Sequence, residues 1–319
     1  MLGFIKNLVG GLALISFTVV GGIANSASCP KSGGILKYGV KAEPPTYDMH
    51  GTNSYAVMHF VAQHYSTLLT FDWNKFPKLE GDVADSWNVS SDGLTYTFKI
   101  KKGIKFHDGT PLTSKDVKAT YDRLRNPPEG VISVRKALFS SISGITTPDD
   151  NTVVFKLSSP DAFMLDGFAS PFNAIYSAKD IAKDPKWHLK NINGTGPYKF
   201  VAHKKGESWK AEKFADFHHG DNCLDGTESF RIKKVAEPLI GGQIMAEWRG
   251  TAPPERVLLK KEMGDNVSFQ AKTLMTLWVV SLNSKTKAFQ NKKVRQAINL
   301  CIDRPVSYTH LRAHETSSY

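Results

Sequence analysis

Residues 84–124 constrain the fold of this chain more than any other stretch. Apolar side chains alternate with polar ones over 84–89 and again over 95–100, which is the period-two pattern of half-buried β-strands. Between the two runs, Asp92-Gly93 supplies the residue with positive φ that a tight hairpin turn needs. The stretch therefore predicts two antiparallel strands joined by a short turn.

A capped helix is predicted directly after this hairpin. Thr113 and Asp116 have the spacing of a capping box, in which each side chain bonds to the backbone of the other residue. Apolar residues then recur on one helical face, and two prolines end the helix: Val117, Tyr121, Leu124, Pro127 and Pro128.

Other segments give weaker structural signals. We expect strands at 33–40, 153–157, 230–235, 267–270 and 277–283, and a helix capped by Asn291. A further helix after residue 54 should bury one face, formed by Met58, Val61, Tyr65 and Leu68. Pro253-Pro254 should interrupt any helix in the segment 246–258.

The run ADSWNVSSDGLTYTFKIKKGIKFHDGTPLTSKDV, residues 84–117, resembles the signature of the family 5 extracellular solute-binding proteins. These are the peptide, nickel and opine receptors of ABC importers. Two further segments resemble the same family: GTGPY at 194–198 and NKKVRQAINLCIDR at 291–304. The Gly-x-Gly of the first is followed by a strand pattern rather than a helix, which disfavours a dinucleotide site.

The resemblance covers residues 30–304 and implies an α/β, type II periplasmic-binding-protein fold with two lobes around a hinge. This chain would hold the first lobe and the start of the second lobe only. The implied division is a signal peptide 1–27, a discontinuous first lobe 28–70 and 186–272, a strand-rich subdomain 71–185 inserted into it, a second-lobe start 273–304 and a tail 305–319.

Residues 305–319 have no apolar face and look like an in-frame translation of a sequencing adapter. We therefore expect this tail to be non-native and exclude it from the fold. The native chain would then continue for a second lobe, and an apolar face and a sheet edge would lie uncovered without it.

The N-terminus predicts export. Residues 8–23 are apolar and Gly-rich, Lys6 precedes them, and the small residues of 24–27 suit signal peptidase. A retained anchor helix is one alternative. A lipoprotein acylated at Cys29 is another, although Ser26 stands where a lipobox has Leu or Val. We expect a periplasmic protein.

Charge and cysteine content exclude other classes. The net charge is +11, but the lysines are scattered along the chain without an Arg-rich run or interleaved aromatic residues. This pattern favours a solvated basic surface over a nucleic-acid site. Three cysteines allow at most one disulfide, and the sequence does not require one.

Thr52, Asn53 and Ser54 are the candidate ligand-binding residues of the first lobe. They precede a predicted helix whose free amides could meet the polar ends of a ligand; an ordinary helix cap and turn is the alternative. Trp278 is the fourth candidate, because by the resemblance it would lie near the cleft and could cover a peptide side chain. A core tryptophan is the alternative there.

His218, His219, Asp221 and Cys223 form a cluster of metal-ligating residue types. Their spacing matches no usual zinc pattern, and neighbouring side chains on an extended chain point to opposite faces. We therefore expect no metal site, and the sequence suggests no cofactor.

The sequence contains no Gly-x-Ser-x-Gly elbow and no His-Glu-x-x-His helix, so a secreted hydrolase is disfavoured. His107 and Asp108 fit a turn better than acid–base chemistry. By resemblance, we expect a monomeric, non-enzymatic receptor that captures a peptide or related small solute between its lobes and delivers it to inner-membrane permease subunits. A nickel, haem or opine ligand, or a scaffold role without transport, are the alternatives.

Overall fold

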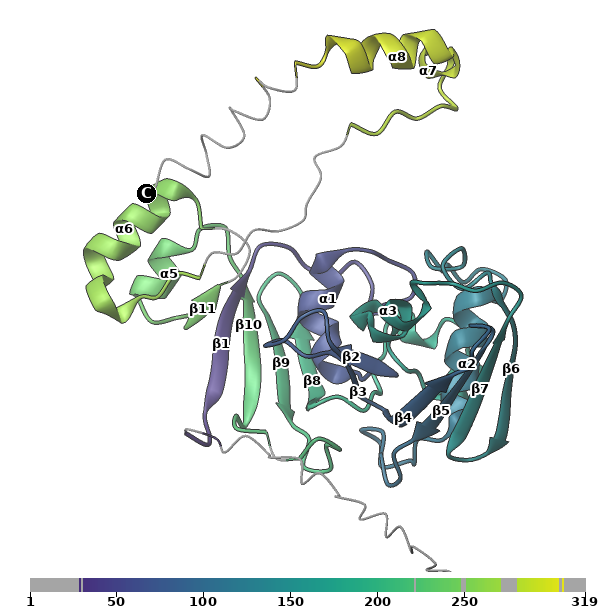
Figure 1. Cartoon of the computed structure of the whole chain (residues 1–319). Helices are drawn as coiled ribbons and strands as arrows, with labels where there is room; N and C mark the ends of the chain where they lie inside the picture. Colours follow the sequence, from purple (N-terminus) through teal and green to yellow (C-terminus); the bar gives the residue numbers. More distant parts are fainter. Residues whose placement is uncertain are drawn as a thin grey trace, which may run out of the picture.

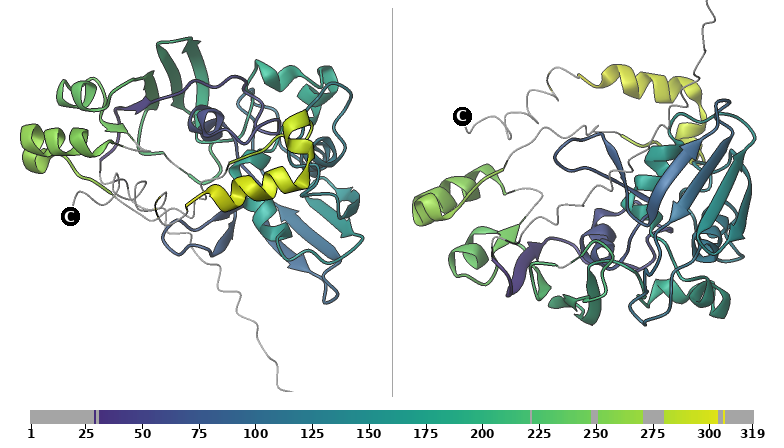
Figure 2. Two further views of the ribbon diagram at one scale, coloured as in Figure 1. Left: turned by 90° about the horizontal axis from the view of Figure 1, so that it is seen from above. Right: turned by 60° about the horizontal axis from the view of Figure 1, so that its bottom comes forward.

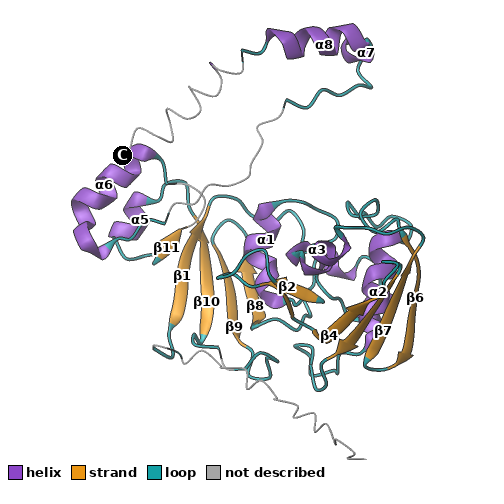
Figure 3. Ribbon diagram, viewed as in Figure 1, coloured by secondary structure: helices purple, strands orange, loops and turns teal. Residues whose placement is uncertain are grey.

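A computed structural model gives the structure of the chain and describes residue 29 and residues 31–220, 222–247, 251–270, 280–303 and 306. The predicted signal peptide, Trp278 and all but one residue of the predicted tail lie outside these described residues. Two main sheets stand side by side, with helices against them (Figure 1; Figure 3). In the described part, no helix combines the length and apolarity needed to cross a lipid bilayer.

The larger sheet is mixed and has the strand order β11-β1-β10-β9-β8. Its first strand runs parallel to β10 and β11, while β9 pairs antiparallel with both β10 and β8. The strands are β1 (Ile35–Val40), β8 (Tyr198–Lys204), β9 (Ser208–Lys213), β10 (Gly226–Arg231) and β11 (Ala246–Glu247). The strand predicted at 33–40 is confirmed. The one predicted at 230–235 is misplaced, because pairing with β1 starts at Gly226 and ends at Arg231.

The second sheet is antiparallel, with the order β4-β5-β7-β6. Its strands are β4 (Ala84–Val89), β5 (Thr95–Ile100), β6 (Ile142–Asp149) and β7 (Thr152–Leu157). The predicted hairpin is confirmed, with Gly93 at φ 69° in its turn. Alternate residues of β5 are buried as the period-two pattern requires, namely Tyr96, Phe98 and Ile100.

Helix α2 (Ser114–Arg125) packs against this second sheet, as all views show (Figure 1; Figure 2). The predicted capping box is present: the Thr113 amide donates to Asp116 Oδ2 at 2.8 Å, and Thr113 Oγ1 accepts from the Lys115 amide. The predicted apolar face is fully buried and forms the centre of the largest hydrophobic core, together with Phe155 and Phe168: Val117, Tyr121 and Leu124.

Helix α1 (Tyr55–Val61) is shorter than predicted and continues only as the 3₁₀ turn η1 (Ala62–His64). The chain then becomes extended at Tyr65, so Tyr65 and Leu68 do not share a helical face with Val61. Both are nevertheless buried in the core. A two-stranded hairpin follows and leads into the second sheet: β2 (Leu69–Phe71) and β3 (Leu79–Gly81).

Three other expectations fail near the C-terminal end. Pro253 opens helix α6 (Pro253–Met263) instead of interrupting a helix, because the first helical turn needs no amide donor there. Residues 267–270 and 280–283 carry no strand; 277–279 lie outside the described residues. These short apolar runs have no described neighbouring strand with which to pair.

The remaining helices are short, and none of the described residues of α7 or α8 is buried. Asn291 caps α8 as predicted, its side chain accepting from the Lys293 amide at 2.9 Å. These elements are α3 (Met164–Ala169), η2 (Pro171–Asn173), α4 (Ala178–Lys183), η3 (Trp187–Leu189), α5 (Ala236–Ile240), η4 (Gly264–Asn266), α7 (Lys287–Gln290) and α8 (Lys292–Cys301).

A disulfide joins Cys29 to Cys223 across 194 residues of sequence. It ties the start of the described chain to the loop that links β9 and β10. Cys301 is free and exposed. The sequence allowed one such bridge but did not identify its partners.

Candidate functional site

The loop that carries Thr52, Asn53 and Ser54 enters α1 with an ordered set of local hydrogen bonds. Thr52 Oγ1 accepts from the Ser54 amide at 3.0 Å, and Ser54 Oγ accepts from the Ala56 amide at 3.2 Å. Asn53 is exposed, whereas Thr52 and Ser54 are half-buried. The structure therefore brings three of the four predicted site residues together; Trp278 lies outside the described residues.

The amides at this helix start are not free, contrary to expectation. Ser54 Oγ holds the Ala56 amide, and Ser54 O accepts from the amides of Val57 and Met58. Helix α1 is also only seven residues long, so its dipole is small. Any ligand contact here must come from side chains, above all from the exposed amide group of Asn53.

Arg135 fixes the loop 52–54 through hydrogen bonds from the protein interior. Its guanidinium donates to Thr52 O at 2.9 Å and to Asn53 Oδ1 at 2.8 Å, and it also reaches the carbonyl oxygens of Met49 and His50. The side chain is buried and its charge lies over the Phe172 ring at 4.5 Å. Burial lowers the pKa of Arg135 to about 10, which leaves it charged at neutral pH.

A closed polar network lies under the same loop. Arg123 donates to both carboxylate oxygens of Asp48, at 2.7 and 3.3 Å, and both side chains are at most 2% exposed. Arg123 also donates to His50 Nδ1 at 2.9 Å, so His50 carries its proton on Nε2, which donates to Ala174 O. Tyr176 completes this network by donating to Asp48 Oδ1.

Electrostatics in this closed network follow from burial and pairing. Burial raises the pKa of Asp48, but the Arg123 guanidinium and the hydrogen bond from the His50 amide lower it below its usual value. Burial lowers the pKa of His50 to about 3, so the ring is neutral at physiological pH. The Tyr176 ring is stacked between His50 and His188, with centroids 4.0 and 3.6 Å away. The network fixes the backbone at 48–50, just before the predicted site.

A cavity of about 230 Å³ opens beside this network. The Asp48–Arg123 pair forms part of its lining, and Gly51 connects it to the predicted site loop. Ile132 and Leu189 contribute apolar surface. The sequence indicated nothing of this arrangement, because Asp48 and Arg123 are 75 residues apart.

The two neighbouring histidines behave differently from the expectation. His218 and His219 lie in a turn, not on an extended strand, and both Nε2 atoms contact Asp82 Oδ1 at 2.9 Å. The side chains therefore converge on an acid that the sequence analysis did not consider. Of the predicted partners, Cys223 is in the disulfide and Asp221 lies outside the described residues.

His107 and the Gly-x-Gly segment are structural, as the sequence suggested. His107 Nε2 donates to Gly196 O at 3.0 Å, and Asp108 Oδ1 accepts from the Thr110 amide within the turn. A Cβ on Gly194 would lie 1.9 Å from His64 O, and one on Gly196 would lie 2.5 Å from the Tyr65 amide nitrogen. The glycines are needed for close backbone packing.

Comparison with known proteins gives consistent similarities. Residues 78–309 match the bacterial extracellular solute-binding proteins, family 5. The glutathione-binding protein GsiB of Pectobacterium atrosepticum is 32% identical over 73% of this chain and 45% of its own length. GsiB of Escherichia coli is 32% identical over 81% of this chain and 49% of its own length. The chain thus spans about half the length of these relatives.

Solved structures show the same relationship. DppA of Helicobacter pylori, in complex with the peptide STSA, superposes with a TM-score of 0.72 and 26% identity over 88% of this chain and 58% of its own. The oligopeptide-binding protein AppA of Bacillus subtilis, bound to a nonapeptide, superposes with a TM-score of 0.72 and 25% sequence identity. The match covers 88% of this chain and 56% of AppA. Both are solute-binding proteins with ligands, and their shared architecture extends over most of the described residues here.

Proposed function

Because the chain belongs to the bacterial extracellular solute-binding proteins of family 5, we propose that it captures a short peptide or peptide-like solute for an ABC importer. Its mixed α/β architecture is that of the type II periplasmic binding proteins, of which the chain covers part. The proposed mechanism is binding between two lobes and delivery of the closed form to permease subunits, with no chemical step.

The observation that carries this proposal is the similarity in fold to two proteins with peptides bound. GsiB, which is named for glutathione binding, adds a small peptide to the same ligand class. The ligand candidates for this chain are therefore short peptides, including glutathione. Nickel, haem and opines are the other solutes to be tested.

We place the first-lobe contribution to the site at Thr52, Asn53 and Ser54. Asn53 is exposed, and its Nδ2 offers a donor to the polar groups of a peptide, while its Oδ1 already accepts from Arg135. Arg135 supports this placement because it fixes Thr52 O and Asn53 Oδ1 from the protein side. Trp278 would add an aromatic surface from the start of the second lobe.

The domain division stays a proposal. The second sheet, 84–157, lies within the proposed inserted subdomain 71–185, and the larger sheet lies within the proposed first lobe. The second lobe would begin at 273, and its native continuation would follow in place of the tail 305–319. Resequencing the locus checks this division: a coding sequence that continues the family pattern after Arg304 is expected, and an authentic stop codon after Tyr319 contradicts it.

Export to the periplasm is supported by the disulfide. Structural disulfides persist in oxidising compartments, and Cys29 lies just after the proposed signal peptide 1–27. Because Cys29 Sγ is bonded to Cys223, it is not available for acylation in this structure. We therefore favour simple secretion over a lipid anchor and expect a soluble monomer.

Isothermal titration of the repaired full-length protein, with its second lobe restored, against glutathione, di- and tetrapeptides, an opine, nickel and haem tests the function. We expect saturable heat with a peptide and no product by mass spectrometry. Asn53→Ala should weaken binding while Asn74→Ala, on an exposed turn, leaves it unchanged. Peptide turnover would favour an enzyme, and the absence of binding to every solute would favour a scaffold.

A further inference from the structure

Asp82, His218 and His219 have the composition and convergence of a transition-metal site. One ligand atom from each residue lies within 4.8 Å of the other two, and the two His Nε2 atoms each contact Asp82 Oδ1 at 2.9 Å. Two imidazoles and a carboxylate are the ligand types that zinc and related divalent metals prefer in sites with an open position. We propose that these three residues bind a divalent transition-metal ion, which we refer to as the Asp82 site.

The distances between Asp82 and the two histidines suit a site whose ligand atoms are hydrogen-bonded to one another when no metal is bound. Tetrahedral ligands at about 2.0–2.1 Å from zinc are roughly 3.3 Å from one another. The Asp82–His contacts are 2.9 Å, so each pair must separate by only a few tenths of an ångström. Rotation of the His219 ring can supply this movement, because its side chain is 38% exposed.

Hydrogen bonds to one oxygen of the Asp82 carboxylate orient the other oxygen toward a metal ion. Asp82 Oδ2 accepts from the Thr67 amide at 2.7 Å and faces Thr67 Oγ1 at 3.4 Å, so Oδ1 alone is directed at the histidines. Such outer contacts fix a ligating oxygen in metal sites. The site joins the hairpin β2–β3 to the turn after β9, which lie 136 residues apart in sequence.

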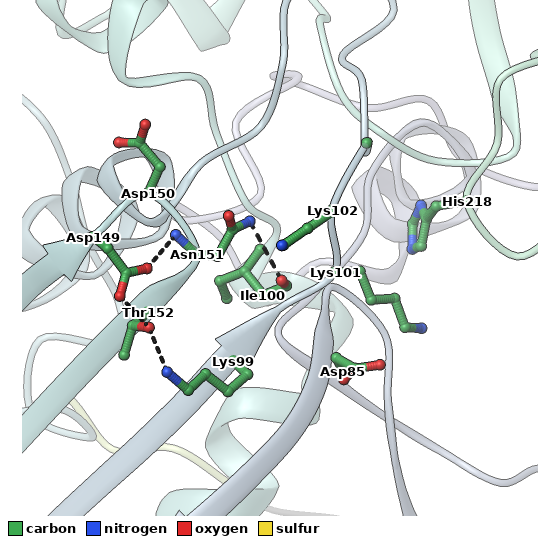
Figure 4. A pocket seen from close by; sticks show the side chains of 11 residues that line it. Asp85, Lys99, Ile100, Lys101, Lys102, Asp149, Asp150, Asn151, Thr152 and His218 are labelled. Carbon is green, nitrogen blue, oxygen red and sulfur yellow. Dashed lines mark hydrogen bonds between the residues drawn. The ribbon is translucent and has the colours of Figure 1, made fainter. Parts of the chain in front are cut away.

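Solvent reaches the site on the side of His219, whose side chain is 38% exposed. His218 lies in the lining of a cavity of about 880 Å³ at the end of β5 (Figure 4). The remaining coordination position can therefore be filled by water or by a small ligand. Lys101 and Asp85 lie on the same side of this cavity, and Lys101 Nζ donates to Gly81 O beside the carboxylate. Its positive charge opposes a cation, whereas Asp85 favours it.

The Asp82 site shares no residue with the proposed peptide site, and it is tested with metal ions instead of peptides. Isothermal titration of the full chain with Zn²⁺ alone, after treatment with a chelator, should show one saturable site. His219→Ala should weaken Zn²⁺ binding by at least about tenfold. Mutating residues that only contact the ligands of a metal site already lowers metal affinity about 10- to 100-fold, and His219 would be a ligand itself. His219 is half-exposed, so this variant should fold.

Two further variants separate coordination from folding and from charge. His218→Gln should weaken Zn²⁺ binding as His219→Ala does, with circular dichroism confirming the native fold. Lys101→Met should tighten it severalfold, because a nearby positive charge is removed; a merely structural contact would not gain affinity. His310 and His314 belong to the tail 305–319, which the sequence analysis excludes from the fold. The double variant His310→Ala with His314→Ala is therefore the control that removes two histidines elsewhere, and it should leave Zn²⁺ binding unchanged.

Cobalt provides an independent readout. Co²⁺ at the Asp82 site should give the intense visible absorption of four-coordinate cobalt, and His219→Ala should abolish it. The proposal is overturned if the wild-type chain binds no stoichiometric Zn²⁺. It is also overturned if His219→Ala and His218→Gln bind Zn²⁺ as tightly as wild type, or if only the control variant loses binding. Unchanged peptide binding in His219→Ala would show that the two sites are independent.

Discussion

The closed network at Asp48–Arg123 and the Asp82 site use similar groups for different ends. Both place a carboxylate against nitrogen donors that include histidine. In the closed network the carboxylate and the guanidinium are at most 2% exposed and paired twice. In the Asp82 site one ring is 38% exposed and a cavity reaches the other. The difference teaches that solvent access, not residue type, separates a polar group that holds the fold from one that can bind.

Breaking the closed pair should have the largest effect. Arg123→Met leaves the Asp48 carboxylate buried without its cation and removes the donor to His50 Nδ1. We expect a loss of about 3–5 kcal/mol in the free energy of unfolding, measured by urea denaturation. Lys115→Met, which removes an exposed ion pair with Asp150, is the control and should change it little. A loss as small as that of the control would show that the network is not structural.

The disulfide should matter more for the Asp82 site than for the closed network. Replacing both Cys29 and Cys223 by serine removes the disulfide, and should lower the free energy of unfolding by about 2–5 kcal/mol. Hydrogen exchange should rise in the loop 214–225, which carries both histidines, and stay unchanged at 48–50. Cys301→Ser is the matched control. Equal exchange increases in both regions would contradict this division.

Local sequence patterns predicted much of the fold but neither polar cluster. The hairpin 84–100 and the capping box of α2 depend on residues within a few positions of each other, so their patterns are readable. The partners of Asp82 are 136 and 137 residues away, and no periodicity reports such a contact. The expectation that His218 and His219 diverge failed because it assumed a strand where the chain turns.

The same limit explains the errors in the candidate site and in the strands. A helix cap was the alternative for the segment that contains Ser54, and it could be read from position alone. The contact of Arg135 with Asn53 could not, because the two residues are 82 positions apart. Residues 267–270 have apolar alternation without a described partner strand, so the pattern alone did not make a strand. Gly196 was recognised as part of a motif, while the reason for it, close packing on His64 and Tyr65, needed the structure.

Acid should destabilise the closed network. His50 is neutral when folded, with a pKa of about 3, and has its usual value of about 6.5 when unfolded. The unfolded state therefore binds more protons between these values, and stability falls as pH falls from about 6.5 toward 3. The slope is about 1.4 kcal/mol per pH unit for this one group.

Urea denaturation between pH 7.5 and 4 measures this slope, and His50→Gln should reduce it by that amount. Glutamine can still accept from Arg123 and donate to Ala174 O. Asp82 acts in a lower window: burial raises its pKa, but its hydrogen bonds with the two histidines lower it to about 2. Its contribution to stability is present above about pH 4 and is lost as pH falls through 2. Parallel curves for wild type and His50→Gln would contradict the neutral histidine.

The smallest effect on stability should come from the Asp82 site itself. His219→Ala removes one hydrogen bond from a half-exposed ring, while His218 keeps its contact with Asp82 Oδ1. Without metal, we expect the free energy of unfolding to fall by about 1 kcal/mol or less. With excess Zn²⁺, only the wild type should gain thermal stability, since a ligand stabilises the state that binds it. The difference between the two proteins should therefore be small in chelator and large in zinc, whereas Arg123→Met should cost the same in both. If His219→Ala destabilised the apo chain as strongly as Arg123→Met, the Asp82 site would be a second structural network, and the contrast between closed and open clusters would fail.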